Sequence, residues 1–230
     1  MIASDRFEFL HLHKSGGTFV NECLLSFVPG ARPLGYHLPR KEIPAALASL
    51  PILGLVRNPW SYYVSWYAFQ AARPQPNPLF QVLSRNRTLD FSATIRNMLE
   101  LGRNPELLTA TVRALPAQYT NRGLNLPGPE LAQIESRDEG FYSFLFRYLY
   151  GEPASRYIAR MEDMRMEFPL LLERVGEKPS DGLRRFFATA PATNVSSHGV
   201  YTDYYDAGLA DLVARRDRSV IERFGYLFTA

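Results

Sequence analysis

The sequence is poor in metal-binding and disulfide-forming residues. It has one cysteine, Cys23, and four histidines in 230 residues. A single cysteine cannot form a disulfide within the chain, so nothing calls for an oxidising compartment. Cys23 falls on the apolar face of a predicted helix, and we expect it to pack there rather than react. Without a cysteine cluster or a histidine pair at helical spacing, the sequence shows no zinc motif, and we expect no metal.

Long apolar runs are also missing. No stretch approaches the ~20 apolar residues that a membrane-spanning helix requires. The first six residues lack the charged segment and long apolar run of a signal peptide. We therefore expect no membrane span, and either a cytoplasmic protein or a chain from which an anchor has been removed.

A strong charge of either sign is absent as well. The chain carries 26 Lys and Arg against 23 Asp and Glu, a formal net charge of +3. This balance suits anionic ligands but lacks the dense basic patch of a nucleic-acid-binding protein. Hydrophobic residues make up 46% of the chain, enough to fill a core. The length fits one domain, residues 1–230.

The most informative stretch is an apolar run that leads into a lysine and a glycine pair. Residues 11–18 read His-Leu-His-Lys-Ser-Gly-Gly-Thr, and apolar residues follow at helical spacing. We predict a strand over 6–12, a tight loop, and a helix over 17–28. Gly16 and Gly17 are expected to turn the backbone with positive φ.

This arrangement favours an anion-binding site. The helix would present its unpaired N–H groups and positive dipole end to the loop, and Lys14 would add a full charge. An ordinary phosphate-binding loop has its lysine after the glycines, whereas here the lysine precedes them. The alternative is a plain strand-to-helix turn with one surface lysine.

A second stretch has the same organisation. Residues 52–56 read as a buried strand, and Arg57 follows at the strand end where open α/β sheets bind ligands. Asn58 is a good helix N-cap and Pro59 a good first helical residue. Ser65 lies about two turns into that helix. An arginine and a hydroxyl placed in this way are suited to a second phosphate.

Together the two stretches resemble the sulfotransferases that use 3′-phosphoadenosine 5′-phosphosulfate (PAPS). Residues 11–18 match the family's H-x-x-K-[ST]-G-G-T motif, although His13 replaces the usual proline. Residues 57–59, Arg-Asn-Pro, with Ser65 match its second motif. The resemblance implies a three-layer α/β/α fold of the P-loop NTPase type with a central parallel sheet. It also implies that the 5′-phosphosulfate is held by Lys14, Ser15, Gly16, Gly17, Thr18 and Phe19, and the 3′-phosphate by Arg57 and Ser65.

The remaining pattern agrees with an α/β class. A predicted helical face over 43–50 and a helix over 59–72 complete a βαβαβα core with right-handed crossovers. Three alternating prolines at 74–78 indicate an exposed connection. We predict a helix over 91–101, a turn-rich loop over 121–129, and an aromatic helical stripe over 141–148 that is more typical of core than of a ligand contact. The resemblance implies that residues 73–153 cover the active site and face the acceptor.

The C-terminal third continues the alternation. A strand over 157–161 precedes a helix that ends at Gly176, and Glu162 and Asp163 between them suit its N-terminus. Residues 192–201 are polar and form a predicted loop. One last predicted helix follows Tyr204, Tyr205 and Asp206.

The expected reaction moves a sulfuryl group from PAPS to a hydroxyl of a carbohydrate or other small acceptor. It releases 3′-phosphoadenosine 5′-phosphate (PAP). Lys14 is the candidate for stabilising the leaving phosphate. Histidine is the usual general base, and we choose His37, with His198 as the second choice. His11 is expected to be buried and hydrogen-bonded. The sequence does not identify the acceptor or the oligomeric state.

Two other classes stay open. A P-loop kinase or NTPase would need a lysine after the glycines and an acidic residue for Mg²⁺, whereas this third strand ends in Arg57. A non-catalytic PAP-binding protein would share the fold, although its motif residues would be under no need to stay intact.

Overall fold

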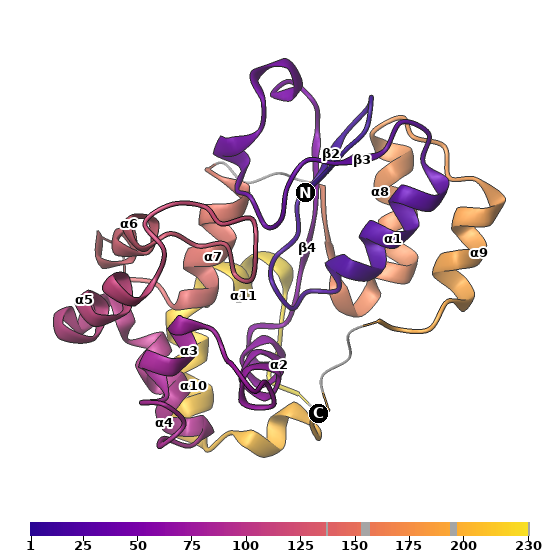
Figure 1. Ribbon diagram of the computed structural model, residues 1–230. Helices are drawn as coiled ribbons and strands as arrows, with labels where there is room; N and C mark the ends of the chain where they lie inside the picture. The colour runs from indigo at the N-terminus through magenta and orange to yellow at the C-terminus, as the bar shows by residue number, and fades with distance from the viewer. Residues whose placement is uncertain (137, 153–156, 194–196, 230) are drawn as a thin grey trace. The chain divides into compact units, whose positions relative to one another are not determined.

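The computed structural model describes residues 1–136, 138–152, 157–193 and 197–229. The chain divides into two compact units (Figure 1). The first comprises Met1–Arg57 and Phe146–Val195, and the second comprises Asn58–Leu145 and Ser196–Ala230. Helix α7 (Phe141–Tyr150) contributes residues to both. None of the helices in the described ranges is both long and apolar enough to cross a membrane.

The first unit contains a five-stranded sheet in the order β3-β1-β2-β4-β5. Its strands are β1 (Ile2–Ala3), β2 (Glu8–Phe9), β3 (Arg32–Pro33), β4 (Ile52–Val56) and β5 (Tyr157–Arg160). Strands β2, β4 and β5 are parallel, whereas β1 is antiparallel to both β2 and β3. The α/β class is confirmed. The three predicted strands, β2, β4 and β5, are parallel as expected, and the unpredicted strand β1 makes the whole sheet mixed. Because β2 and β3 are both antiparallel to β1, they run in the same direction.

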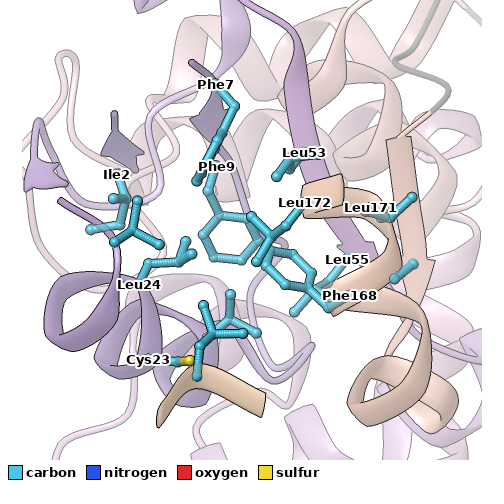
Figure 2. Packing of buried hydrophobic residues seen from close by; sticks show 14 of the residues in the cluster. Ile2, Phe7, Phe9, Cys23, Leu24, Leu53, Leu55, Phe168, Leu171 and Leu172 are labelled. Atoms are coloured by element: carbon cyan, nitrogen blue, oxygen red, sulfur yellow. The ribbon is translucent and has the colours of Figure 1, made fainter. Parts of the chain in front are cut away.

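Two helices, α1 (Gly17–Phe27) and α8 (Met164–Arg174), pack on one face of this sheet, and α9 (Asp181–Thr189) packs against both of them on the same side (Figure 1). Alternate strand residues point toward them, because successive side chains of a strand face opposite sides. Phe9, Leu53 and Leu55 meet Phe168 and other apolar residues of α8 in the core (Figure 2).

Cys23 lies in this core, on α1, and is fully buried (Figure 2). Its burial raises the pKa of the thiol to about 12, so the thiol stays protonated near neutral pH. The expected packing role of Cys23 is therefore confirmed.

Several predicted elements of the first unit differ from the structure. Only Glu8–Phe9 of the strand predicted over 6–12 forms a ladder, although the Leu10 N–H still donates to the Leu53 carbonyl (3.0 Å). The helix predicted over 43–50 is absent, and two short 3₁₀ turns, η1 (Arg40–Glu42) and η2 (Ala45–Leu47), take its place. Pro44 separates the turns, and proline has no N–H with which to continue a helix.

Other predictions of the first unit agree with it. Strand β4 has the predicted bounds, and β5 ends one residue earlier than expected. The 3₁₀ turn η5 (Met161–Asp163) leads into α8, and the chain turns after this helix at Gly176 with φ +81°. Asp163 pairs with Arg160 (2.7 Å), which agrees with a structural role.

The second unit is helical in its described part. The described α-helices that lie wholly in this unit are α2 (Pro59–Ala71), α3 (Pro78–Leu83), α4 (Phe91–Leu99), α5 (Pro105–Ala114), α6 (Gly128–Leu131), α10 (Ala207–Arg216) and α11 (Arg218–Phe224). The 3₁₀ helices η3 (Leu101–Arg103), η4 (Ala132–Ser136) and η6 (Tyr201–Tyr204) lie in the same unit. Side-chain oxygens cap the first turns of α2, α3, α4, α5 and α10, as the sequence predicts for Asn58.

A buried polar network organises this unit. Asp217 is 0% exposed and accepts hydrogen bonds from the Tyr63 hydroxyl (2.7 Å) and the Ser143 N–H (2.8 Å). Burial raises the pKa of the Asp217 carboxyl to about 6. Gly140 is required beside it, because an added Cβ would lie 2.6 Å from a carboxylate oxygen.

The region predicted to face the acceptor is only partly described, since residues 137 and 153 lie outside the described ranges. Within it, the aromatic stripe of α7 is core, as expected: Phe141, Phe144 and Leu145 are buried. The turn-rich loop before α6 is compact, because the buried Asn125 side chain accepts N–H hydrogen bonds from Thr120 (2.8 Å) and Asn121 (2.9 Å).

Candidate anion-binding site

The loop between β2 and α1 turns through two left-handed residues. Lys14 has φ +59° and Gly16 has φ +79°, whereas Gly17 does not have a positive φ. The expectation of a positive φ at Gly17 is therefore wrong. Gly17 begins α1, and the space for its side chain is occupied by the imidazole ring of His11.

Lys14 and Arg57 come together at the ends of the neighbouring parallel strands β2 and β4. Nη1 of Arg57 donates to the backbone carbonyl of Lys14 (3.0 Å). Burial, with a smaller contribution from the nearby Arg57 charge, lowers the pKa of the Lys14 ammonium to about 8. Two cations thus share one partly buried region, an arrangement that a bound anion would stabilise.

His37 lies beside this loop, at the end of the segment that follows β3. It is 9% exposed, and its Nδ1 is 3.2 Å from the backbone carbonyl of His11. Because a carbonyl can only accept, Nδ1 carries the proton of this hydrogen bond. Burial lowers the pKa of His37 to about 4, so the ring is neutral near pH 7 and Nε2 is the basic nitrogen.

Three histidine rings form a cluster around His37. The His11 ring is 4.5 Å from the His37 ring and the His13 ring 5.0 Å, measured between centroids. Burial, with a smaller contribution from His37, keeps the pKa of His11 well below its usual value. His11 is therefore buried, as the sequence predicts, and its ring is neutral near pH 7. Among the residues that the structure describes, no group of three metal-ligating side chains has metal-site geometry.

The other predicted contacts of the loop differ in accessibility. Ser15 is buried, Thr18 is exposed, and the Phe19 side chain packs in the core against Phe186 and Phe187. The Phe19 N–H donates to the Gly16 carbonyl (3.1 Å). Phe19 is thus the predicted cofactor-binding residue that this geometry favours least.

Two predicted site residues belong to the second unit. Ser65 lies in α2 and is 1% exposed, and His198 lies in the polar loop before η6. His198 Nδ1 is 2.8 Å from the Gly199 carbonyl. Their participation in a site with Lys14 stays a prediction, and residues 194–196 of that polar loop lie outside the described ranges.

Sequence reasoning missed the residues that support the loop. Tyr150 of α7 donates its hydroxyl to the Leu55 carbonyl (2.7 Å) and accepts from the Leu55 N–H (2.9 Å). Its ring requires a glycine at position 54, where an added Cβ would lie 2.5 Å from a ring carbon. A lone glycine inside a buried strand is the signal that could have revealed this close approach.

Comparison with known proteins adds no assignment. No protein-family model matches the chain, and no curated protein matches it.

Proposed function

We propose that the chain is a PAPS-dependent sulfotransferase of the P-loop type, with the corresponding three-layer α/β/α fold. It transfers the sulfuryl group to a hydroxyl of a carbohydrate or other small acceptor and releases PAP. The observation that carries the proposal is the convergence of Lys14 and Arg57 beyond the ends of two parallel strands, where the Arg57 guanidinium donates to the backbone carbonyl of Lys14 (3.0 Å). Ligands of open α/β sheets bind at this edge.

The two cations have different roles in the proposed reaction. Lys14, in the loop before α1, neutralises the charge that develops on the bridging oxygen as the sulfur–oxygen bond to the 5′-phosphate breaks. The loop and first helical turn from Ser15 to Phe19 surround that phosphosulfate, and Arg57 binds the 3′-phosphate. An arginine suits this position because its planar guanidinium binds phosphate oxygens in pairs.

His37 is the proposed general base. The acceptor oxygen attacks sulfur, its proton moves to Nε2 of His37, and PAP leaves with the electrons of the broken bond. The hydrogen bond to the His11 carbonyl leaves Nε2 unprotonated, which is the form that accepts a proton. The bound anionic donor would raise the low pKa of His37 toward neutrality.

The test is loss of transfer on removal of either cation. We expect Lys14→Ala and Arg57→Ala each to abolish sulfate transfer, since positioned donors of this kind contribute about 3–4 kcal/mol each. Circular dichroism should remain unchanged. Lys178→Ala and Arg174→Ala remove exposed charges of the same unit and serve as matched controls.

Calorimetry with PAP and with ATP–Mg²⁺ separates this proposal from a kinase or NTPase. We expect PAP to bind wild type without Mg²⁺ and to lose affinity in both cation variants. Full activity and unchanged PAP affinity in either variant, or selective binding of ATP–Mg²⁺, would contradict the proposal. PAP binding without transfer to any hydroxyl in an acceptor library would leave the non-catalytic alternative in its place.

A further inference from the structure

His11 is a buried side chain beside the candidate site, and no role in the reaction has been given to it. It is 5% exposed. Its ring stacks on Phe9, with centroids 5.6 Å apart and planes 22° apart, and its Nε2 lies 3.4 Å from the Asn21 amide nitrogen of α1. The ring therefore sits between the end of β2 and the first turns of α1.

The contact between His11 and Gly17 sets how closely these two elements approach. A Cβ added to Gly17 would lie 2.0 Å from Cγ and Nδ1 of His11. Real Cβ atoms do not approach other atoms so closely, and the clash is with a ring buried on all sides. Gly17 is therefore glycine because of the His11 ring, whereas Gly16 is glycine because its φ is +79°.

The backbone of His11 holds a second part of the site. Its carbonyl accepts the hydrogen bond from Nδ1 of His37 (3.2 Å), and the two rings meet edge to face at 4.5 Å. His37 also has a left-handed backbone, with φ +49°, which a non-glycine residue adopts only when its surroundings hold it there. One residue thus contacts both the helix that follows the Lys14 loop and the proposed base.

We propose that His11 is a positioning residue: its ring spaces the Lys14 loop from α1, and its carbonyl fixes His37 with the proton on Nδ1. This inference rests on the proposed function, which supplies PAP as the ligand. The contacts of His11 with Gly17 and His37 do not depend on that function. A displacement of the His11 ring would move the loop and the His37 hydrogen bond together. Misplacement by about 1 Å can cost about 100-fold in a positioned site.

A double-mutant cycle between His11 and Gly17 tests the spacing. We expect Gly17→Ala to weaken PAP binding by about tenfold or more, because the new Cβ displaces the ring. The same change in a His11→Ala background should cost much less, since the ring is gone. His11→Phe keeps a flat ring against Gly17 and Phe9, and should bind PAP within about threefold of wild type. Equal costs of Gly17→Ala in both backgrounds would overturn the spacing role.

Nitrogen-15 NMR of His37 tests whether the His11 carbonyl fixes the proton on Nδ1. The measurement reports the tautomer of the folded protein and not its stability. We expect the proton on Nδ1 in wild type and in His11→Phe, and a changed tautomer ratio in Gly17→Ala but not when Gly17→Ala is added to His11→Ala. A proton on Nε2 in wild type would overturn the inference. If wild type does not bind PAP, the proposed function fails, and the same NMR cycle still decides the role of His11.

Discussion

His37 combines two properties that a general base needs at the scale of a single residue. Its hydrogen bond to the His11 carbonyl leaves Nε2 with a lone pair, and its low pKa, about 4, keeps the free ring neutral. A base with so low a pKa is weak until a neighbouring anion raises it. The proposed donor supplies such an anion, so His37 would become a better base when PAPS is bound.

We predict that His37→Ala lowers turnover by about 100-fold or more while PAP affinity changes little, because a base acts on the acceptor proton. His198→Ala is the matched comparison, since His198 is the other candidate base and has a separate position in the polar loop. Steady-state kinetics and PAP calorimetry on both variants are the measurements. A loss confined to PAP affinity in His37→Ala, or a larger turnover loss in His198→Ala, would transfer the role away from His37.

At the scale of elements, Tyr150 links the strand ends that carry the two cations. Its hydroxyl is hydrogen-bonded to the Leu55 backbone of β4, and its oxygen also lies 3.3 Å from the Leu10 carbonyl, just after β2. Lys14 and Arg57 follow these two strands, so the phenol sets the separation from which both loops start. Gly54 makes room for it.

We predict that Gly54→Ala destabilises the protein by about 1–3 kcal/mol, the usual cost of forcing extra volume into a packed interior. The added Cβ would be 2.5 Å from a Tyr150 ring carbon. Gly199→Ala is the control, because no heavy atom of the described residues lies within 4 Å of its added Cβ and its φ is not positive. Urea unfolding of both variants gives the comparison. An equal effect at the two sites would show that Tyr150 does not constrain β4.

The same scale explains which elements could be predicted. Helices with a capping residue and a proline at the first position, such as α2 after Asn58, were predictable because the local chemistry alone defines their start. The two-residue strands β1 and β3 were not, since two residues show no alternation. The helix expected over 43–50 does not form, although its apolar residues have helical spacing, because Pro44 cannot donate the N–H hydrogen bond that would continue it.

Some features of the candidate site could likewise be predicted from the sequence, and others could not. Lys14 and Arg57 could be placed at one sheet edge from strand order alone, and the structure brings them into contact. The reason for Gly17 could not be read from the sequence, because it depends on where the His11 ring lies after folding. Local rules thus find the loop and its charge, and tertiary packing decides which side chains support it.

For the whole molecule, buried ionisable groups act on stability in opposite directions. Burial raises the pKa of Glu8 to about 7 and that of Asp217 to about 6, from 4.5 and 3.8. Glu8 is 0% exposed, and neither of its oxygens has a hydrogen-bond partner within the described chain. The folded protein therefore holds protons that the unfolded chain releases, and this contribution to stability is lost as pH rises from about 4 to 7.

The buried imidazoles have the reverse effect. His11 and His37 have pKa values lowered from 6.5, to about 4 for His37, so the unfolded chain binds protons that the folded protein does not. Their contribution is present above pH 6.5 and is lost as pH falls toward 4. The two sets of groups titrate over nearly the same range, and the wild-type free energy of unfolding should change less with pH than either set alone would require.

We predict that single substitutions reveal the hidden pH dependence. Glu8→Gln removes a buried carboxyl whose pKa is raised. Between pH 5 and pH 8 the free energy of unfolding of this variant should therefore rise by about 2–3 kcal/mol relative to that of wild type. His37→Gln removes a buried imidazole whose pKa is lowered. Over the same interval its free energy of unfolding should fall by about 2 kcal/mol relative to that of wild type. Urea unfolding of the three proteins at pH 5, 6.5 and 8 gives both differences, which do not depend on any constant cost of the substitution. Curves that stay parallel to wild type would mean that Glu8 and His37 titrate normally and are solvated in the folded protein. Because a solvated His37 would not be held by the His11 carbonyl, that result would also count against the tautomer on which its role as a base depends.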